Sequence, residues 1–523
     1  KIDMIVSPST AYVNGYRHSY ISDIRIPIDK PRTIQTISST ASSASYGNYV
    51  VATTMKGIMR VDQFGQVNLR DAITHGGNTI GQARIRAIEK FNDDFKIYLF
   101  DIIMAAAKNF GMVKSIGTST TVYGDVNQDN TGVAAQSGLF TSIEDATNND
   151  LFFPVSKDRP RSISEMIVTT QHRLTATSSG TTATLSATSI GSDYVFDDGN
   201  SWIGVLNSSG VVDTNMSVSI DGADATITNL TSGAAHTFLV YAFKTGNLAN
   251  NKANHKTKTL TTVAAAAITP ATIDGIANCI SLSKTDIYDI VSITKSSVDI
   301  SDRYILDNGQ KDNFYDVGKL ILKAGSAAPS GDVTVSFRYF AHGANGDFFA
   351  VNSYLADLAY EDVPSHRTKS GSTIELREVL DFRPVRATEG LNFHPGTSNH
   401  IFPLPRVNDT LTYKIQFYLG QKGIAYVHES GKIGIELGEA EEFPKYPRLD
   451  KSYLKLARCH LFPYMLSDED IYVSHMDNRR YTMRDIGNIE KRVDEIEELT
   501  SLNMLETETN GLTFLDASGN PRL

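Results

Sequence analysis

Cysteine is scarce in this sequence, and long apolar runs are missing. Only two cysteines occur among 523 residues, Cys279 and Cys459, and neither lies near a Cys or His pair at the spacing of a zinc site. Buried thiols in a reducing cytoplasm are therefore favoured over a metal site or a disulfide. The longest apolar runs, such as 102–107 and 263–268, fall far short of the roughly 18 residues that a membrane-spanning helix needs. No membrane span is expected.

Positive charge is also in deficit. The chain carries 49 Lys and Arg residues against 59 Asp and Glu, a formal net charge of −10. Such a field repels a phosphate backbone, so no nucleic-acid partner is expected. The chain opens at Lys1 with no apolar segment behind it, and no secretory signal is expected in these residues. At roughly 100 to 200 residues per domain, the length predicts three or four folded domains.

Local signatures of catalysis are missing as well. The sequence contains neither a Gly-x-Ser-x-Gly elbow nor a Gly-x-x-x-x-Gly-Lys phosphate loop, and its 12 histidines form no paired metal-binding motif. The best calcium candidate, 125–136, has Asn130 where the loop needs glycine and Gln136 where it needs a bidentate carboxylate. We therefore predict no catalytic residue, no metal site, no cofactor and no enzymatic activity.

Two clusters of acidic residues allow an enzymatic interpretation as an alternative. The carboxylates of 468–470, and of Glu439, Glu441 and Glu442, could pair across a cleft for glycoside hydrolysis. Carboxylates are mostly exposed in folded proteins, so a solvated face is the favoured interpretation.

Most of the chain has the pattern of short antiparallel strands. Segments 333–340 and 411–419 alternate with the period of two that is typical of a sheet with one buried face. Segment 79–104 is best explained by two paired strands, although its first run also fits a short helix. The region 162–262 is rich in Ser, Thr, Gly and Ala and contains short runs at 181–186, 225–230 and 237–243, with Trp202 between them. This pattern favours an inserted β-sandwich of immunoglobulin or fibronectin type III kind.

The last long element is predicted to be a helix over 482–508. Its sequence has no proline and one glycine, and apolar residues recur along one face, first at 3-4-3 spacing, while charged residues occupy the other faces. A coiled-coil strand and a helix packed on its own domain explain the pattern equally well. The candidate oligomerisation residues are Ile486, Ile489, Val493, Ile496, Leu499 and Leu502.

The predicted fold is therefore mainly β and multidomain: antiparallel sheets, an inserted immunoglobulin-like or fibronectin-like sandwich, and a C-terminal helix that forms a coiled coil in one of its two interpretations. The predicted ranges are a β-rich domain in two parts, 1–161 and 263–445, the inserted module 162–262, and a C-terminal region 446–523.

The sequence contains five strings that are specific in combination: 80–89 followed by 98–102, 306–316, 346–349 with 352–354, 381–384, and 479–492. Together they resemble a family of large structural proteins from the virions of contractile-tailed bacteriophages, including those of cyanophages. The domain that this family shares has no assigned function. The strings are spread from residue 80 to the C-terminal helix, and the inserted module between them matches nothing in the family pattern.

The resemblance implies a baseplate or tail-fibre-associated protein that links baseplate wedge proteins and tail fibres through protein–protein interfaces. Such a protein is assembled in the host cytoplasm and resides in the virion. Other tail proteins and further copies of the chain are the implied partners, and no catalytic residues are implied. Family members continue past the position of Leu523, which implies that this chain is part of a longer protein.

Two other functions stay open at this point. In the first, the sandwich is an adhesin module that binds a glycan of the host surface. In the second, which has less support, the chain is a tailspike that degrades polysaccharide. The motifs themselves suggest scaffold: 307–309 has turn chemistry, and Arg383 beside Pro384 is suited to a bidentate pair with a carboxylate at the end of a strand.

Overall fold

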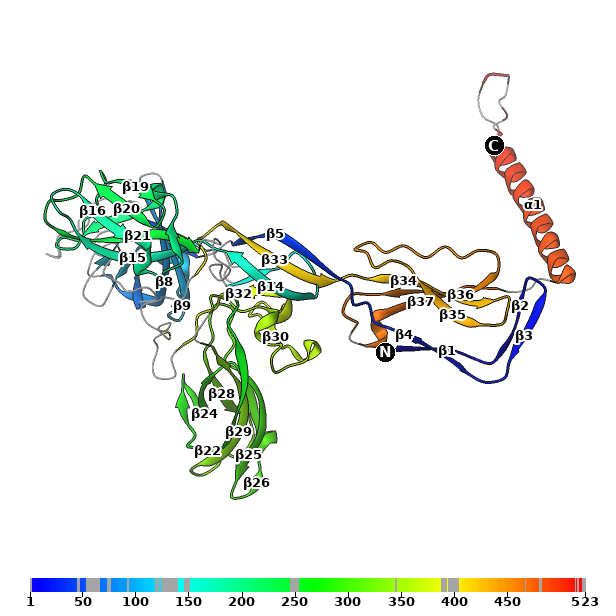
Figure 1. Ribbon diagram of the computed structural model, residues 1–523, viewed down its shortest axis with the longest axis horizontal. Helices are drawn as coiled ribbons and strands as arrows, with labels where there is room; N and C mark the ends of the chain where they lie inside the picture. Colours follow the sequence, from blue (N-terminus) through cyan, green and yellow to red (C-terminus); the bar gives the residue numbers. More distant parts are fainter. Residues whose placement is uncertain are drawn as a thin grey trace. The chain divides into compact units, whose positions relative to one another are not determined.

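The chain is mainly strand, arranged in antiparallel sheets, with one long helix among the described residues (Figure 1). The predicted mainly β, multidomain class with a C-terminal helix is thereby confirmed. The computed structural model describes residues 2–44, 48–52, 66–72, 77–91, 94–117, 122–123, 140–144, 151–244, 254–343, 346–386, 393, 404–465, 467–478, 482–512, 514 and 517–519.

The chain divides into two compact units, Lys1–Pro31 with Leu419–Leu523, and Arg32–Tyr418. The four ranges predicted from the sequence follow changes of composition along the chain, and they stay a prediction. No local pattern signals that the two ends of a sequence fold together.

In the first unit, N-terminal strands and a C-terminal sheet share one core. Ile28, Leu461 and Met465 lie buried together. Asn14 and Gly15 have positive φ values of 47° and 89°, as in the two-residue turns that join hairpin strands. The N-terminal pairs are β1 (Ile2–Val6) with β4 (Ile24–Ile28), and β2 (Ser9–Val13) with β3 (Tyr16–Tyr20); the C-terminal sheet runs in the order β35 (Ile433–Leu437), β34 (Gln421–His428), β36 (Tyr453–Leu461) and β37 (Ile471–His475), with the 3-10 turn η9 (Asp468–Asp470) before β37.

The second unit begins with a seven-stranded sheet built around a long hairpin. β8 (Thr79–Phe91) and β9 (Asp94–Met104) pair along their lengths, which confirms the two strands predicted for 79–104 and excludes the helix alternative. Val67 and Ile97 are fully shielded from solvent in the core of this sheet. The sheet order is β11 (Val122–Tyr123), β10 (Ser115–Gly117), β7 (Gln66–Arg70), β8, β9, β6 (Tyr49–Ala52) and β12 (Phe140–Ile143), and η2 spans Phe110–Met112.

The Ser- and Thr-rich region forms two small sheets over a shared core. Phe196 and Trp202 pack edge to face in that core, with 4.8 Å between ring centroids. The strands predicted at 181–186, 225–230 and 237–243 are present, and the arrangement is a sandwich; its assignment to the immunoglobulin or fibronectin type stays a prediction. One sheet contains β15 (Thr170–Thr177), β21 (Ala235–Lys244), β17 (Tyr194–Phe196) and β18 (Ile203–Leu206); the other contains β16 (Ala183–Ser186), β20 (Asp224–Thr228) and β19 (Ser217–Asp221), and η3 (Ala187–Ser189) and η4 (Gly199–Ser201) lie in the connections.

Residues 258–342 form another pair of facing sheets, each with four strands, around a core of their own. Val335 and Phe337 of the central strand are buried against Ile280 and Leu320 of the facing sheet. The sheets run in the orders β22 (Lys258–Ile268), β29 (Val333–His342), β25 (Ile287–Lys295), β26 (Val298–Asp299), and β23 (Ala271–Ile273), β24 (Ile276–Thr285), β28 (Val317–Leu322), β27 (Tyr304–Asp307), with η5 at Ser301–Arg303.

The largest core of the second unit lies beneath β33 (Asp409–Tyr418), the middle strand of a three-stranded sheet. Every second residue of β33, from Leu411 to Phe417, is buried, as the predicted period of two requires. Its partners are β5 (Ile34–Ala44) and β14 (Pro160–Ile167); β13 (Phe152–Pro154) pairs with β32 (Val379–Asp381), β30 (Ser365–Arg367) pairs with β31 (Thr373–Glu375), and the 3-10 turns are η6 (Val351–Ser353), η7 (Tyr360–Asp362) and η8 (Leu376–Glu378).

Candidate interaction helix and buried polar centre

The predicted C-terminal helix is α1 (Met483–Gly511), drawn in red in Figure 1. Thr482 caps it: the hydroxyl oxygen accepts a hydrogen bond from the Asp485 amide at 3.3 Å, and the Asp485 carboxylate accepts one from the Thr482 amide at 2.9 Å. This reciprocal capping box satisfies amides that have no partner inside a helix. Hydrogen bonds from the Thr482 hydroxyl and amide hold the pKa of Asp485 below its ordinary value. The sequence therefore fixes where α1 begins.

The apolar stripe of α1 is exposed to solvent. None of the 29 residues of the helix is buried, and all 29 are described. A continuous apolar stripe of this kind, bordered by charges, is typical of a surface that another helix or protein covers. The six predicted oligomerisation residues all lie on the stripe, with exposed fractions of 48% for Ile486, 48% for Ile489, 47% for Val493, 58% for Ile496, 60% for Leu499 and 53% for Leu502.

The stripe has two parts with different spacing. From Ile486 to Ile496 the apolar residues follow 3-4-3 spacing, which keeps them on one face of a helix with 3.6 residues per turn. From Ile496 onward Leu499, Leu502 and Leu505 follow at steps of three, and each step turns the stripe by about 60° around the axis. The two parts therefore face different directions.

Polar residues beside the stripe already have hydrogen-bond partners. The Thr500 hydroxyl donates to the Ile496 carbonyl oxygen at 2.6 Å, and the Thr507 hydroxyl donates to the Asn503 carbonyl oxygen at 2.7 Å. Such bonds to the preceding turn satisfy a threonine hydroxyl within its own helix. Thr500 can therefore enter an interface without leaving an unsatisfied donor.

Three of the five strings that carry the resemblance meet at one buried polar centre in the second unit. At its middle, the Lys258 ammonium donates to Asp286 Oδ2 at 2.7 Å, to the Tyr354 hydroxyl at 2.8 Å and to the Tyr315 hydroxyl at 2.9 Å. The side chains of both Lys258 and Asp286 are completely shielded from solvent. The centre consists of Lys258, Asp286, Gln310, Tyr315, His342, Tyr354, Asp381 and Arg383.

Each oxygen of the Asp286 carboxylate is occupied. Gln310 Nε2 donates to Oδ1 at 3.0 Å, and His342 Nε2 donates to Oδ2 at 2.8 Å beside Lys258. Burial alone would raise the pKa of Asp286, but the charge of Lys258 and the hydrogen bond from His342 outweigh it and hold the pKa below its ordinary value. The carboxylate is therefore ionised at neutral pH.

Aromatic rings surround the Lys258 ammonium. Its nitrogen lies 4.5 Å from the ring centroids of Tyr315 and Phe349 and 4.6 Å from that of Tyr354. Ring faces attract a desolvated cation, so these contacts partly replace the lost hydration of the ammonium.

The predicted bidentate pair of Arg383 is confirmed, and its partner is Asp381. Arg383 Nε donates to Asp381 Oδ1 at 3.0 Å and Nη2 donates to Oδ2 at 2.8 Å. The remaining donors reach the Lys311 carbonyl oxygen at 2.8 Å and the Tyr315 hydroxyl at 2.9 Å. Burial would raise the pKa of Asp381, but Arg383 outweighs it and lowers the pKa. Arg383 thus ties the end of β32 to the segment that carries Tyr315.

The predicted turn at 307–309 is also confirmed, and it positions Gln310. Asp307 Oδ1 accepts from the Gly309 amide and Asn308 Oδ1 from the Gln310 amide, each at 3.1 Å. Gly309 has φ of +80°, and a Cβ there would lie 2.2 Å from the Asp316 carbonyl oxygen. Glycine is therefore required at this position.

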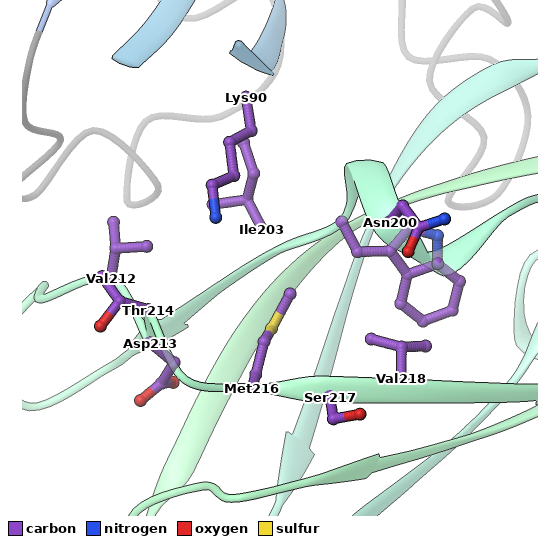
Figure 2. A pocket seen from close by; sticks show the side chains of 11 residues that line it. Lys90, Asn200, Ile203, Val212, Asp213, Thr214, Met216, Ser217 and Val218 are labelled. Atoms are coloured by element: carbon purple, nitrogen blue, oxygen red, sulfur yellow. The ribbon is translucent and has the colours of Figure 1, made fainter. Parts of the chain in front are cut away.

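A polar pocket of about 200 Å³ lies on the sandwich where β8 approaches it. Figure 2 shows the Met216 side chain between Asp213 and Asn200, with Lys90 reaching in from β8. Burial raises the pKa of Asp213, although His236, at 3.4 Å, opposes the shift. The polar groups that line the pocket come from Lys90, Asn200, Trp202, Asp213, Thr214 and Ser217.

Several further predictions can be compared with the structure. Cys279 and Cys459 are free and buried. Glu439, Glu441 and Glu442 are exposed, as the solvated-face interpretation expects. The calcium candidate 125–136 and the first three residues of string 479–492 lie outside the described residues. Among the described residues, no group of three or more His, Cys, Asp or Glu is placed to hold a metal ion, and no helix has the length and apolarity to cross a membrane.

Sequence reasoning missed Lys258 and Asp286. Each occupies a recognisable place along the chain, because Lys258 is the first residue of β22 and Asp286 is the single residue between β24 and β25. Neither place identifies the partner, which lies 28 residues away. No protein-family model, no curated protein and no solved structure matches this chain.

Proposed function

We propose that the chain is a structural component of the contractile tail of a bacteriophage, located at the baseplate and assembled in the host cytoplasm. It links baseplate wedge proteins and tail fibres through protein–protein interfaces, associates with further copies of itself, and catalyses no reaction. The five strings described above support the phage assignment as a resemblance.

The observation that carries the proposal is the exposed apolar stripe of α1. A 29-residue helix with no buried residue lacks the tertiary packing that stabilises most protein helices. Covering the stripe with a partner supplies that packing. The polar centre supports the scaffold part of the proposal, because its hydrogen-bonded ion pairs are shielded from solvent and fix three chain segments.

A nonsense mutation at the start of the coding region tests the proposal. Purified particles should then lack this chain, and the tail fibres or baseplate should be missing in electron micrographs. Supplying the protein from a plasmid should restore both. Normal infectious particles without the chain would contradict the proposal.

The polar pocket favours a second candidate function, in which the sandwich binds a glycan of the host surface. Carboxylate, amide and hydroxyl groups in one concave site are suited to sugar hydroxyls. Ser217→Trp would fill the pocket and should abolish binding of glycans released from the host envelope. Ser219→Trp, also exposed on β19 and outside the pocket, is the matched control and should bind normally. Equal binding by both variants would count against this function.

A further inference from the structure

We infer that α1 forms a parallel, in-register three-stranded coiled coil with the same helix of two other copies. The inference rests on the proposed self-association and adds the number of copies and their direction. The 3-4-3 part of the stripe sets the register: Ile486, Val493 and Thr500 occupy position a of successive heptads, and Ile489, Ile496 and Asn503 occupy position d.

The number of copies follows from side-chain shape. All four core residues of the first two heptads are β-branched, at a and at d alike. Two-stranded coiled coils favour leucine at d, whereas β-branched residues at both positions shift the preference to three strands. Ile489 and Ile496 at d therefore argue against a dimer. The a positions carry Ile486 and Val493 rather than leucine, which argues against four strands.

The direction follows from charge. In a parallel coil, position g of one helix faces the following position e of its neighbour, which places Arg492 against Glu497 of the next copy. In an antiparallel coil, e positions face each other, and Glu490 would meet Glu497. In the parallel arrangement Asp485, at g, also faces Glu490 of the next copy, although its carboxylate accepts a hydrogen bond from the Thr482 amide at the helix cap. The attraction between Arg492 and Glu497 offsets that repulsion, whereas the antiparallel arrangement has the repulsion between Glu490 and Glu497.

The next two core layers of the coil, formed by Thr500 and Asn503, are polar and are compatible with the same register. Thr500 enters its layer with its hydroxyl already bonded to the Ile496 carbonyl oxygen. The Asn503 amides of three copies can hydrogen-bond to one another, which penalises any shift in register. Leu502 falls at position c, outside this core.

Sedimentation equilibrium of the purified full chain tests the number of copies. The expected mass is three times the chain mass of 57.2 kDa. A dimer, a tetramer or a monomer would overturn the inference. Such a mass would not decide whether the chain is part of the tail, which the nonsense mutation described above tests separately.

Charge reversal tests the direction. In the parallel trimer, Glu497→Arg places an arginine against Arg492 of the next copy. The three exposed pairs between Arg492 and Glu497 are then lost together, and the association constant should fall by about tenfold. Arg492→Glu should have a similar effect, and the double variant should restore wild-type association. In an antiparallel coil, Glu497→Arg would face Glu490 and strengthen association instead. A strengthened single variant, or a double variant that is no better than the single ones, would overturn the parallel arrangement.

Discussion

Lys258 and Asp286 form an ion pair, with 2.7 Å between Nζ and Oδ2, and solvent reaches neither side chain. Removing two charges from water costs several kcal/mol for each ion, on the order of the attraction between them. The pair is tolerable because the remaining hydrogen-bonding sites are occupied by Gln310, Tyr354 and His342. Removing one partner would leave the other charge buried without its counter-charge.

Lys258→Met should therefore lower the free energy of unfolding of the second unit by about 3 to 5 kcal/mol, since it strands the Asp286 carboxylate. Urea unfolding followed by circular dichroism and by Trp202 fluorescence measures this. The matched control is Lys414→Met, which breaks a partly exposed pair with Glu165 and should cost less than about 1 kcal/mol. Equal losses in the two variants would contradict the structural role of Lys258.

Arg383→Lys should destabilise the second unit although it keeps the charge. Lysine cannot reproduce the two parallel hydrogen bonds to Asp381, and the loss should be about 2 to 4 kcal/mol. Arg338→Lys changes a similar bidentate pair, with Asp289, at a site that is more than a third exposed. It should cost less than about 1 kcal/mol in the same unfolding experiment.

Acid should destabilise the second unit in two stages. Burial lowers the pKa of His342 below its ordinary value of 6.5, in spite of the Asp286 carboxylate. The unfolded chain therefore takes up this proton first, and stability falls as the pH drops from 6.5 toward the folded pKa. The pKa values of Asp286 and Asp381 are lowered, so their stabilisation is complete above the ordinary value of 3.8 and is lost below it.

The first stage can be isolated by mutation. His342→Gln keeps a donor for Asp286 and removes the titrating group, so its urea midpoint should fall less than that of the wild type between pH 7 and pH 5. Below pH 4 the two proteins should lose stability alike. Identical curves over the whole range would exclude His342 as the source of the first stage.

Val493→Asp should dissociate the oligomer without weakening either β-rich unit. The residue lies in the proposed core of the coil and is about half exposed in the single chain, so a carboxylate there is harmful mainly in the assembly. Leu502→Asp is the positional control, because it lies outside that core and should leave the mass unchanged. The account fails if Leu502→Asp dissociates the oligomer and Val493→Asp does not.

The local sequence pattern predicted individual strands, turns and the helix better than it predicted which of them contact one another. The alternation of β33, the β8–β9 hairpin and the start of α1 at Thr482 all follow from side chains within a few residues of each other. Segments 307–309 and 381–384 likewise revealed a turn and a bidentate pair.

Contacts between residues that are far apart in the chain could not be predicted from local pattern. Nothing local joins the first 31 residues to the chain beyond Leu419, and nothing local matches Lys258 with Asp286 or brings both to Tyr315. These contacts depend on how sheets pack, and one sequence carries no record of it. The exposure of the α1 stripe could not be predicted from the sequence either, because the pattern alone fits a buried face equally well.

The central proposal is that the chain belongs to a phage baseplate, and cryo-electron microscopy of the proposed virion tests it most directly. The account predicts density for the chain at the baseplate, with α1 helices from three copies packed in parallel around their Ile489 and Val493 side chains. A particle without this chain, or one in which the α1 stripe faces solvent along its whole length, would contradict the account.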